Sequence, residues 1–193
     1  MTGSTDPYLY PGTDVLKNLR DIHDPAILNR YEAESTTRRI VELIDSPMSG
    51  RFDATHLRAI HKHIFQDVYA WAGQFRTVNI SKGGHPFGAA LFIERTLTAL
   101  LQKVSAEGYL QGTDPDSFVR RAGFFLSEIN AVHPFREGNG RTQREFIREL
   151  GLLAGVVVDW TRITRDQMLL ASRVSFETGD SAAIASLIGL SMR

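Results

Sequence analysis

The group of residues in this sequence that could most readily do chemistry is the stretch HPFREGNGRTQR, which spans positions 133–144. Gly138 and Gly140 flank Asn139, so the backbone can adopt positive φ and turn its N–H groups inward around an anion. The stretch leads directly into a helical pattern, and the free N–H groups and dipole at a helix N-terminus favour negative charge. This spacing predicts an anion cradle at the start of a helix.

The charged side chains of the same stretch extend that prediction to a polyphosphate. Arg141 and Arg144 are three residues apart and therefore neighbours on the helix. Glu137 would repel a phosphate alone, but beside a polyphosphate it can hold a Mg²⁺ ion that bridges phosphate oxygens. His133 is the group there that can exchange a proton near neutral pH. Phe135 is apolar in a polar loop, and we expect it to anchor the loop in the core.

Each of these features also has an ordinary interpretation. An isolated GNG is usually a turn, Arg141 could pair with Glu145 at i+4, and a single histidine is more often structural than catalytic. The combination in one loop favours a site that handles phosphate groups. It does not choose between nucleotidyl and phosphoryl transfer. The three histidines His56, His61 and His63 fall in one predicted helix at spacings that do not share a face, so we expect no transition-metal site there.

Composition excludes several other classes of function. The chain has 193 residues, 22 basic and 22 acidic side chains and no cysteine. The balanced charge gives no field for nucleic acid or membrane binding, and without cysteine there are no disulfides or thiolate nucleophiles. No apolar run is long enough to cross a bilayer, and the polar N-terminal residues lack the basic-then-apolar order of a secretory signal. We therefore expect a cytoplasmic protein that is not bound to a membrane or directly to nucleic acid.

Hydrophobic periodicity predicts the elements that must position the site. Helical patterns dominate after a polar, turn-rich N-terminal arm at residues 1–30, and β-forming residues with a Gly-Gly turn predict one short hairpin at residues 74–87. Asp114 and Pro115 have the order of an N-cap followed by the first helical residue. The fold class is therefore mainly α, a single domain over residues 1–193 built as a helical bundle. The expected helices cover residues 35–44, 53–71, 89–108, 113–133, 140–155 and 164–192.

The stretch at 133–144 resembles the signature of the Fic family, H-P-F-x-[D/E]-G-N-G-R-x-x-R, and matches it at every fixed position. The likeness extends beyond the loop. YAWAGQFRTVNI resembles the strand-forming flap of that family, and DPYLYPGTDVLKN resembles an N-terminal arm of bacterial members. The resemblance covers most of the chain, and it implies the Fic-type helical bundle with a β-hairpin flap.

The resemblance also implies an activity. Fic proteins with this signature transfer AMP from ATP to a hydroxyl side chain of another protein and release pyrophosphate. It implies His133 as the general base, Glu137 as the Mg²⁺ ligand and Phe135 as the buried anchor. It implies that ATP and its phosphates are bound by Gly138, Asn139, Gly140, Arg141 and Arg144. A related branch, the Doc-type kinases, has a modified loop, whereas the intact GNGR here favours transfer of AMP.

The resemblance gives the hairpin a purpose as well. In the family the flap pairs in β fashion with an extended segment of the target protein and places the hydroxyl near the α-phosphate. On that basis Val78, Asn79 and Ile80 are the expected pairing strand. An ordinary structural hairpin is the alternative.

Many Fic enzymes are inhibited by a glutamate from an [S/T]-x-x-x-E-[G/N] helix that pairs with the second arginine of the signature. Here only Glu107 and Glu137 precede Gly or Asn, and Lys103 and His133 stand four residues before them, so neither fits. The resemblance therefore implies that an inhibitory glutamate comes from a separate small antitoxin and reaches Arg144. It implies the toxin of a toxin–antitoxin pair, with a type II DNA topoisomerase as one class of target.

Three alternatives stay open from the sequence. The chain could be a docking module of the same fold, or a transferase that uses another donor such as UTP or CDP-choline, because the signature contains no residues that recognise the base. It could also be the Fic domain of a longer secreted effector.

Overall fold

The computed structural model describes residues 6–193, and within them the chain forms seven α-helices and one two-stranded antiparallel hairpin. This confirms the predicted mainly α bundle with a single hairpin. The helices are α1 (Pro25–Asp45), α2 (Ala54–Phe65), α3 (Ile93–Ala106), α4 (Pro115–Val132), α5 (Asn139–Ala154), α6 (Arg165–Thr178) and α7 (Ala182–Ser191). The strands are β1 (Ser81–Lys82) and β2 (His85–Pro86), with Ser81 opposite Pro86 and Lys82 opposite His85.

Local sequence signals explain where several helices begin. Asp114 accepts a hydrogen bond from the Ser117 N–H at 2.9 Å and Pro115 follows as the first residue of α4, as the sequence predicts. Asp53 caps α2 in the same way. Thr164 starts α6 with a full capping box, in which its side chain and that of Gln167 each bond the other's backbone.

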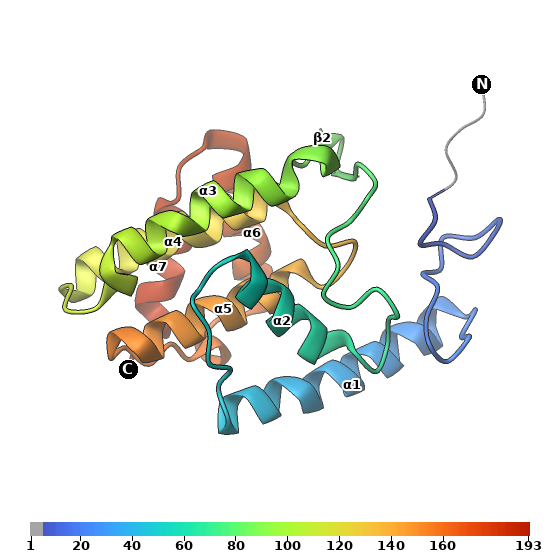
Figure 1. Cartoon of the computed structure of the whole chain (residues 1–193), viewed down its shortest axis with the longest axis horizontal. Coiled ribbons are helices and arrows are strands. Elements are labelled where there is room, and N and C mark those ends of the chain that lie inside the picture. The colour runs from blue at the N-terminus through green and yellow to red at the C-terminus, as the bar shows by residue number, and fades with distance from the viewer. Residues whose placement is uncertain (1–5) are drawn as a thin grey trace.

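The helices surround α4, which runs through the middle of the bundle beside α3 and in contact with α5, α6 and α7 (Figure 1). Its apolar stripe is fully or almost fully buried, because neighbouring helices cover it from several sides. This stripe consists of Phe118, Ala122, Phe125, Ile129 and Val132. The helix α2 lies between α1 and α5, so α1 closes the lower side of the bundle in Figure 1. This arrangement brings the end of α4 and the start of α5 to the same end of the molecule as the hairpin.

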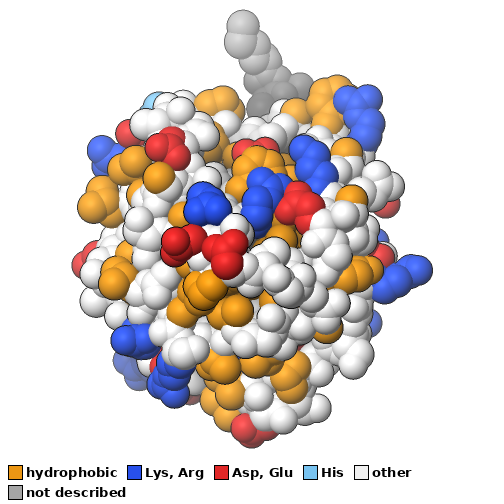
Figure 2. Space-filling view, turned by 90° about the vertical axis from the view of Figure 1, so that its left-hand side faces the viewer, with side chains coloured by type: hydrophobic (Ala, Val, Ile, Leu, Met, Phe, Trp, Pro, Cys, Tyr) orange, Lys and Arg blue, Asp and Glu red, His pale blue; other side chains and the backbone are white. Residues whose placement is uncertain are grey.

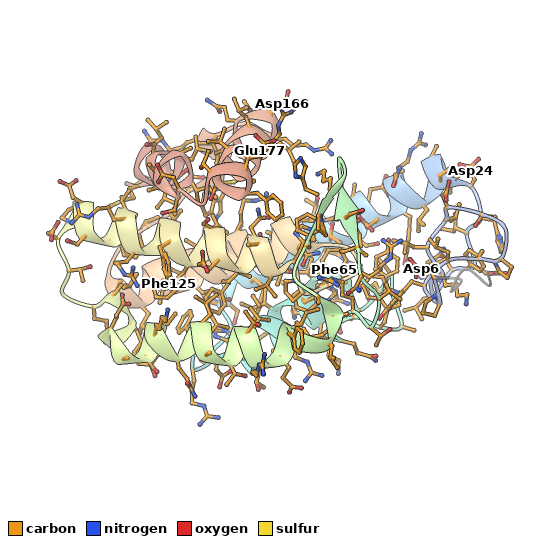
Figure 3. The ribbon with its side chains drawn as sticks, turned by 90° about the horizontal axis from the view of Figure 1, so that it is seen from above. Asp6, Asp24, Phe65, Phe125, Asp166 and Glu177 are labelled. Atoms are coloured by element: carbon orange, nitrogen blue, oxygen red, sulfur yellow. The ribbon has the colours of Figure 1, made fainter. Side chains whose placement is uncertain are left out.

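The N-terminal arm packs against that end as well. Asp6 forms an ion pair with Arg136 at 2.9 Å. The Tyr8 hydroxyl accepts a hydrogen bond from the Thr77 N–H at 3.1 Å, and the Tyr8 ring meets Trp71 edge-on. Asp6 and Phe65 are labelled toward one end of the molecule in Figure 3, away from Phe125. The arm thus braces both the loop at 133–144 and the approach to the hairpin.

Four boundaries differ from those predicted. The strands are confined to residues 81–86 of the predicted 74–87 hairpin, so Val78, Asn79 and Ile80 lie before β1. The second helix ends at Phe65 instead of residue 71, and the chain continues in turns, in which the Val68 N–H donates to the Phe65 carbonyl and the Ala72 N–H to the Tyr69 carbonyl. The first helix begins at Pro25, inside the predicted arm of residues 1–30, whose first five residues lie outside the described part. The last helix is divided at Gly179, which adopts φ +71° and ends α6.

The surface carries mixed charge. On the face shown in Figure 2, acidic and basic side chains are interspersed and hydrophobic patches lie among them. Among the described helices, none is both long enough and apolar enough to cross a membrane.

Candidate active site

His133 is the residue that ends α4, and it adopts a left-handed conformation with φ 49° and ψ 64°. Its Nδ1 lies 3.2 Å from the carbonyl oxygen of Asn130, and its ring stacks on Phe87 at a centroid distance of 3.9 Å. A carbonyl can only accept a hydrogen bond, so Nδ1 carries the proton and Nε2 keeps its lone pair. Burial, reinforced by the positive charges of Arg76 and Lys82, lowers the pKa of His133 to about 4. The imidazole is therefore neutral near pH 7 and able to accept a proton at Nε2.

The helix α5 starts directly after the turn that contains Glu137 and Gly138. Gly138 is the N-cap residue with φ +82°, and no side chain caps this helix. A Cβ at position 138 would lie 2.2 Å from Cζ of Phe65, so only glycine fits both the backbone and the space. The amides of Asn139, Gly140 and the residue after it belong to the first turn, where N–H groups have no intrahelical acceptor. Without a cap, this end of α5 can receive an anion.

Asn139 contributes to the loop through its side chain. Its Oδ1 accepts from the Phe135 N–H at 2.9 Å and its Nδ2 donates to the Phe135 carbonyl at 2.7 Å. Phe135 is fully buried and stacks on His61 at 3.9 Å. The side chain of Asn139 therefore fixes the loop at the buried Phe135. The backbone N–H of Asn139 belongs to the first turn of α5 and is the only group of this residue that could bind an anion there.

Glu137 lies at the rim of the same turn, and 44% of its side chain is exposed. Its Oε1 accepts a hydrogen bond from the Gly138 N–H at 2.8 Å and lies 3.4 Å from Nη2 of Arg141. Both contacts are made by one carboxylate oxygen. An exposed carboxylate beside an anion cradle is a suitable donor for Mg²⁺, which takes one or two protein carboxylates and completes its shell with phosphates and water.

Arg141 is held by several partners. Its guanidinium lies 2.6 Å from Oε1 of Glu32, donates to the Thr36 hydroxyl at 3.1 Å and lies over the ring of Phe65 at 4.7 Å. The Tyr69 hydroxyl bonds the other oxygen of Glu32. Burial, with the charge of Glu32 beside it, raises the pKa of Tyr69 well above its usual value. Arg141 does not pair with Glu145, which instead binds Arg148 at 2.6 Å.

Arg144 differs from Arg141 in having no carboxylate partner among the ion pairs of residues 6–193. Burial, together with the charge of Arg141, lowers the pKa of its guanidinium. It lines a groove of about 590 Å³ between α1, α5 and the segment after α5. The apolar part of the lining comes from Ile40, Ile44, Leu152, Val157, Val158, Trp160, Ile163 and Met168.

The segment before β1 is linked to His133 by Phe87, which follows β2. Phe87 bonds the Ile80 backbone and stacks on the His133 ring. The Ile80 carbonyl accepts from the Phe87 N–H at 3.1 Å, and the Val78 carbonyl accepts from Nη1 of Arg76 at 2.7 Å. Asn79 lies between them and is exposed, with its side chain bonded to the Ala90 N–H at 2.9 Å. The backbone N–H and carbonyl of Asn79 take part in none of the backbone hydrogen bonds between residues 6–193.

Three residues that support the site are not singled out by the sequence. Arg76 is a fully buried cation that bonds the His133 carbonyl at 2.8 Å. His61 donates from Nε2 to the Glu137 carbonyl at 3.0 Å and accepts from the Gly73 N–H at 2.8 Å. Burial lowers its pKa to about 3, so the ring is a neutral link between α2 and the loop at 133–144. Glu32 is the third, through its ion pair with Arg141.

The sequence offers little to find these three residues. Their partners are 57, 76 and 109 positions away along the chain. Because these partners come from distant segments, no local residue pattern marks the three residues.

Residues 51–150 match the profile of the Fic/DOC family. The protein adenylyltransferase VbhT of Bartonella schoenbuchensis is 44% identical over 96% of this chain, which spans 39% of that protein's length. The probable protein adenylyltransferase y4lH of Sinorhizobium fredii is 41% identical over 95% of this chain and 94% of its own. The similarity thus extends over nearly the whole chain, which spans about two fifths of one relative and almost all of the other.

Solved structures share the fold. The N-terminal Fic domain of a VirB-translocated effector from Bartonella quintana, solved with bound ADP, superposes with a TM-score of 0.92 at 31% identity, covering 96% of this chain and 94% of that one. The Bartonella tribocorum effector BepC, solved with AMPPNP, gives a TM-score of 0.91 at 29% identity and covers 96% of each chain. The complete signature at 133–144, the uncapped start of α5 and these matches lead to one conclusion: the chain belongs to the Fic/DOC family.

Proposed function

We propose that this protein is a protein adenylyltransferase, which transfers AMP from ATP to a hydroxyl side chain of another protein. The observation that carries the proposal is the neutral imidazole of His133 beside the uncapped start of α5 with its two arginines. Relatives that carry the name protein adenylyltransferase, and Fic domains solved with ADP or AMPPNP, support the same activity.

The phosphates of ATP are received by α5. The backbone N–H groups of Asn139, Gly140 and Arg141 point along the helix axis toward the α-phosphate. Arg141, already held in place by Glu32, contacts the middle of the phosphate chain. Arg144 receives the terminal phosphate, because its charge is desolvated and no carboxylate of residues 6–193 neutralises it.

His133 moves the proton. Its Nε2 takes the proton from the target hydroxyl as the hydroxyl oxygen attacks the α-phosphorus atom. The new P–O bond forms while the bond from that phosphorus to the bridging oxygen of the β-phosphate breaks, and pyrophosphate leaves. The hydrogen bond from Nδ1 to Asn130 keeps the ring in the tautomer that this step requires.

Glu137 is the residue that would hold Mg²⁺. A Mg²⁺ ion bound by Glu137 would supply positive charge that stabilises the leaving pyrophosphate. The chain's own contribution is to keep Oε1 of Glu137 fixed by the Gly138 N–H while leaving the side chain partly exposed. This arrangement fits a metal that reaches the site together with the nucleotide.

The target segment docks on the residues before β1. The carbonyls of Val78 and Ile80 already accept hydrogen bonds from Arg76 and Phe87. The backbone of Asn79 is therefore the part of this segment that remains to pair with a target. An extended target segment that pairs there gains main-chain hydrogen bonds without a demand on its sequence. Because Phe87 also stacks on His133, a hydroxyl presented from this edge lies near the base.

The test is transfer of label from α-³²P-ATP, with Mg²⁺, into proteins of a bacterial lysate and into a purified type II DNA topoisomerase. His133→Ala and Glu137→Ala should lose the label. The matched controls are His63→Ala on α2 and Glu177→Ala on α6, which lie outside the site and should retain it. Label from γ-³²P-ATP would identify a kinase, and label only from UTP or CDP-choline a different donor. No label from any donor, with nucleotide binding retained, would favour a docking module.

We also propose that a separate antitoxin inhibits this enzyme. The groove beside Arg144 has a largely apolar lining, and the buried Arg144 guanidinium has no carboxylate partner among residues 6–193, which suits an amphipathic helix that carries a glutamate. If a small protein is encoded next to this chain, its co-expression should suppress the label, and Arg144→Ala should weaken its binding. If no neighbouring protein binds and expression alone is harmless, the role of a domain in a secreted effector is favoured, as in the Bartonella proteins.

A further inference from the structure

Arg76 joins both stems of the hairpin segment to the end of α4. The guanidinium donates to the carbonyls of Val78 at 2.7 Å, Val132 at 3.1 Å and His133 at 2.8 Å, and Nη2 also bonds the Gly88 carbonyl. Its side chain is fully buried. One planar group thus contacts the first stem of the hairpin, the second stem and the last turn of the helix that ends at the candidate base.

The charge of Arg76 is compensated by backbone dipoles. It takes part in none of the ion pairs of residues 6–193, and burial lowers its pKa, although an arginine side chain stays protonated in proteins. The carbonyls of Val132 and His133 belong to the C-terminal end of α4, where unsatisfied carbonyls and the helix dipole favour a cation. The guanidinium therefore bonds the carbonyls that α4 cannot satisfy itself.

The second stem approaches α4 closely at Gly88. Its N–H donates to the Ala131 carbonyl at 3.1 Å. A Cβ at this position would lie 3.3 Å from both Cα and O of Val132, which is tighter than ordinary contact. On the first stem, the Arg76 N–H donates to the Pro134 carbonyl at 2.9 Å. Both stems thus rest on backbone atoms of residues 131–134.

We infer that Arg76 is a positioning residue for the transfer reaction, which couples the target-docking hairpin to His133 so that the two keep one fixed separation. The inference rests on the proposed function. Arg76 touches no reacting atom in this arrangement. It acts by holding the docked hydroxyl and the imidazole in register, and a displacement of about 1 Å between reacting groups can cost about 100-fold in rate.

The first test separates the rate of transfer from nucleotide binding. Arg76→Lys keeps the charge but replaces the planar fork by a compact ammonium that cannot span four carbonyls. Gly88→Ala leaves Arg76 intact and moves the second stem away from Val132. We expect both variants to lower the rate of label transfer from saturating α-³²P-ATP into the lysate protein that the unmodified chain labels by at least 10-fold. The dissociation constant for ATP should stay within twofold, because neither residue touches α5.

The matched control is Arg121→Lys. Arg121 lies in the first half of α4 and binds Glu107 through two guanidinium nitrogens, so Arg121→Lys makes the same exchange of a planar fork for an ammonium without touching the hairpin. It should leave both the rate and the ATP affinity unchanged. If Arg76→Lys and Gly88→Ala transfer label as fast as the unmodified chain, the inference is wrong. A loss of ATP affinity equal to the loss of rate would also overturn it, since that indicates general loosening.

A second readout needs no activity. The charged groups near the His133 ring are Arg76, from the hairpin stem, and Lys82, from β1, and both disfavour its protonation. In Arg76→Gln the pKa of His133, followed by NMR of the imidazole, should rise, whereas in Arg76→Lys it should stay low. An unchanged His133 titration in Arg76→Gln would exclude coupling even if the unmodified chain failed to transfer AMP. Absence of transfer by the unmodified chain, with the pKa shift present, would refute the proposed function and leave the coupling intact.

Discussion

The consecutive helices α4 and α5 begin in opposite ways. At the start of α4, Asp114 caps the Ser117 N–H, Pro115 takes a position that needs no donor, and an acidic residue lies in the first turn. At the start of α5, Gly138 offers no side-chain cap and the first turn contains no acid. Arg141 lies in that first turn and Arg144 one turn later. The start of α4 is capped by its own residues, whereas the start of α5 has no side-chain cap.

The difference shows how stability and binding are divided between the two ends. A side-chain cap contributes about 1 kcal/mol to a helix, and an acid in the first turn about 0.3–1 kcal/mol. At α5 these contributions are absent among the described contacts, and the same backbone groups remain for phosphate. Substitutions at the start of α4 should therefore act on stability, and substitutions at the start of α5 on binding.

The largest effect is expected from Gly138→Ala. The new Cβ meets Phe65 at 2.2 Å in a backbone conformation with φ +82°. Left-handed backbone in a non-glycine residue costs about 1–2 kcal/mol and overpacking about 1–3 kcal/mol. Chemical denaturation should show a loss of about 3 kcal/mol or more, and calorimetry should show weaker binding of AMPPNP.

Gly155→Ala is the matched control for that substitution. Gly155 ends α5 with a similar φ of +80°, but nothing lies within 4 Å of its Cβ position. It should lose only the backbone cost and bind AMPPNP normally. Equal effects at the two glycines would mean that Phe65 does not shape the start of α5.

Arg144→Gln should change binding strongly and stability little. A hydrogen bond to a charged group contributes about 1.5–3 kcal/mol, so the dissociation constant for ATP should rise about 10- to 100-fold. The free energy of unfolding should stay equal or increase, because a desolvated guanidinium without a carboxylate is removed.

Arg141→Gln is the contrasting variant. It leaves Glu32 largely buried without its ion-pair partner, with only 12% of that side chain exposed. It should therefore lower the free energy of unfolding as well as ATP affinity. If Arg144→Gln proved the more destabilising of the two, the distinction between a held and an unpaired arginine would be lost.

His133, which ends α4, makes the free energy of unfolding depend on pH. The pKa of His133 is lowered by burial to about 4, while that of an unfolded histidine is about 6.5. The unfolded chain therefore binds a proton first, and the free energy of unfolding should fall as pH drops from about 6.5 to about 4. His133 alone accounts for at most about 3 kcal/mol of that loss. Denaturation curves of His133→Gln across this range should show a shallower fall, and an identical fall would contradict the lowered pKa.

The smallest effect is expected from Asp114→Ala. Loss of this cap should lower the free energy of unfolding by about 1 kcal/mol, seen as a lower denaturation midpoint. ATP affinity and label transfer should not change. A change in ATP affinity would mean that the start of α4 is coupled to the site and that the two helix ends are not separate.

Much of the site could be predicted because its residues are consecutive. The signature at 133–144 contains the histidine, the turn and both arginines within one loop, and the caps of α2 and α4 are read from neighbouring residues. The start of α1 has the same Asp-Pro order as α4, at Asp24 and Pro25. This pattern indicates a helix that starts at Pro25, so the predicted arm of residues 1–30 is too long at its C-terminal end.

The supports of the site could not be predicted in this way. Arg76 acts through carbonyls of residues 78, 88, 132 and 133, and backbone acceptors leave no trace in the residue types that supply them. The strands are shorter than the run of β-forming residues because the first stem bonds Arg76 instead of the second stem at Val78. Local propensity cannot register a competing partner that comes from the tertiary fold.

The contacts of the arm and of α1 have a consequence for the inheritance of this fold. The family match begins at residue 51, yet Asp6 holds Arg136, and Glu32 and Thr36 hold Arg141 from outside that region. A recombination event that carried only residues 51–150 into another protein would transfer the whole signature but leave its first arginine without an anchor. The segment that keeps Arg136 and Arg141 anchored is therefore longer than the segment that the family profile matches, and it includes the arm and α1.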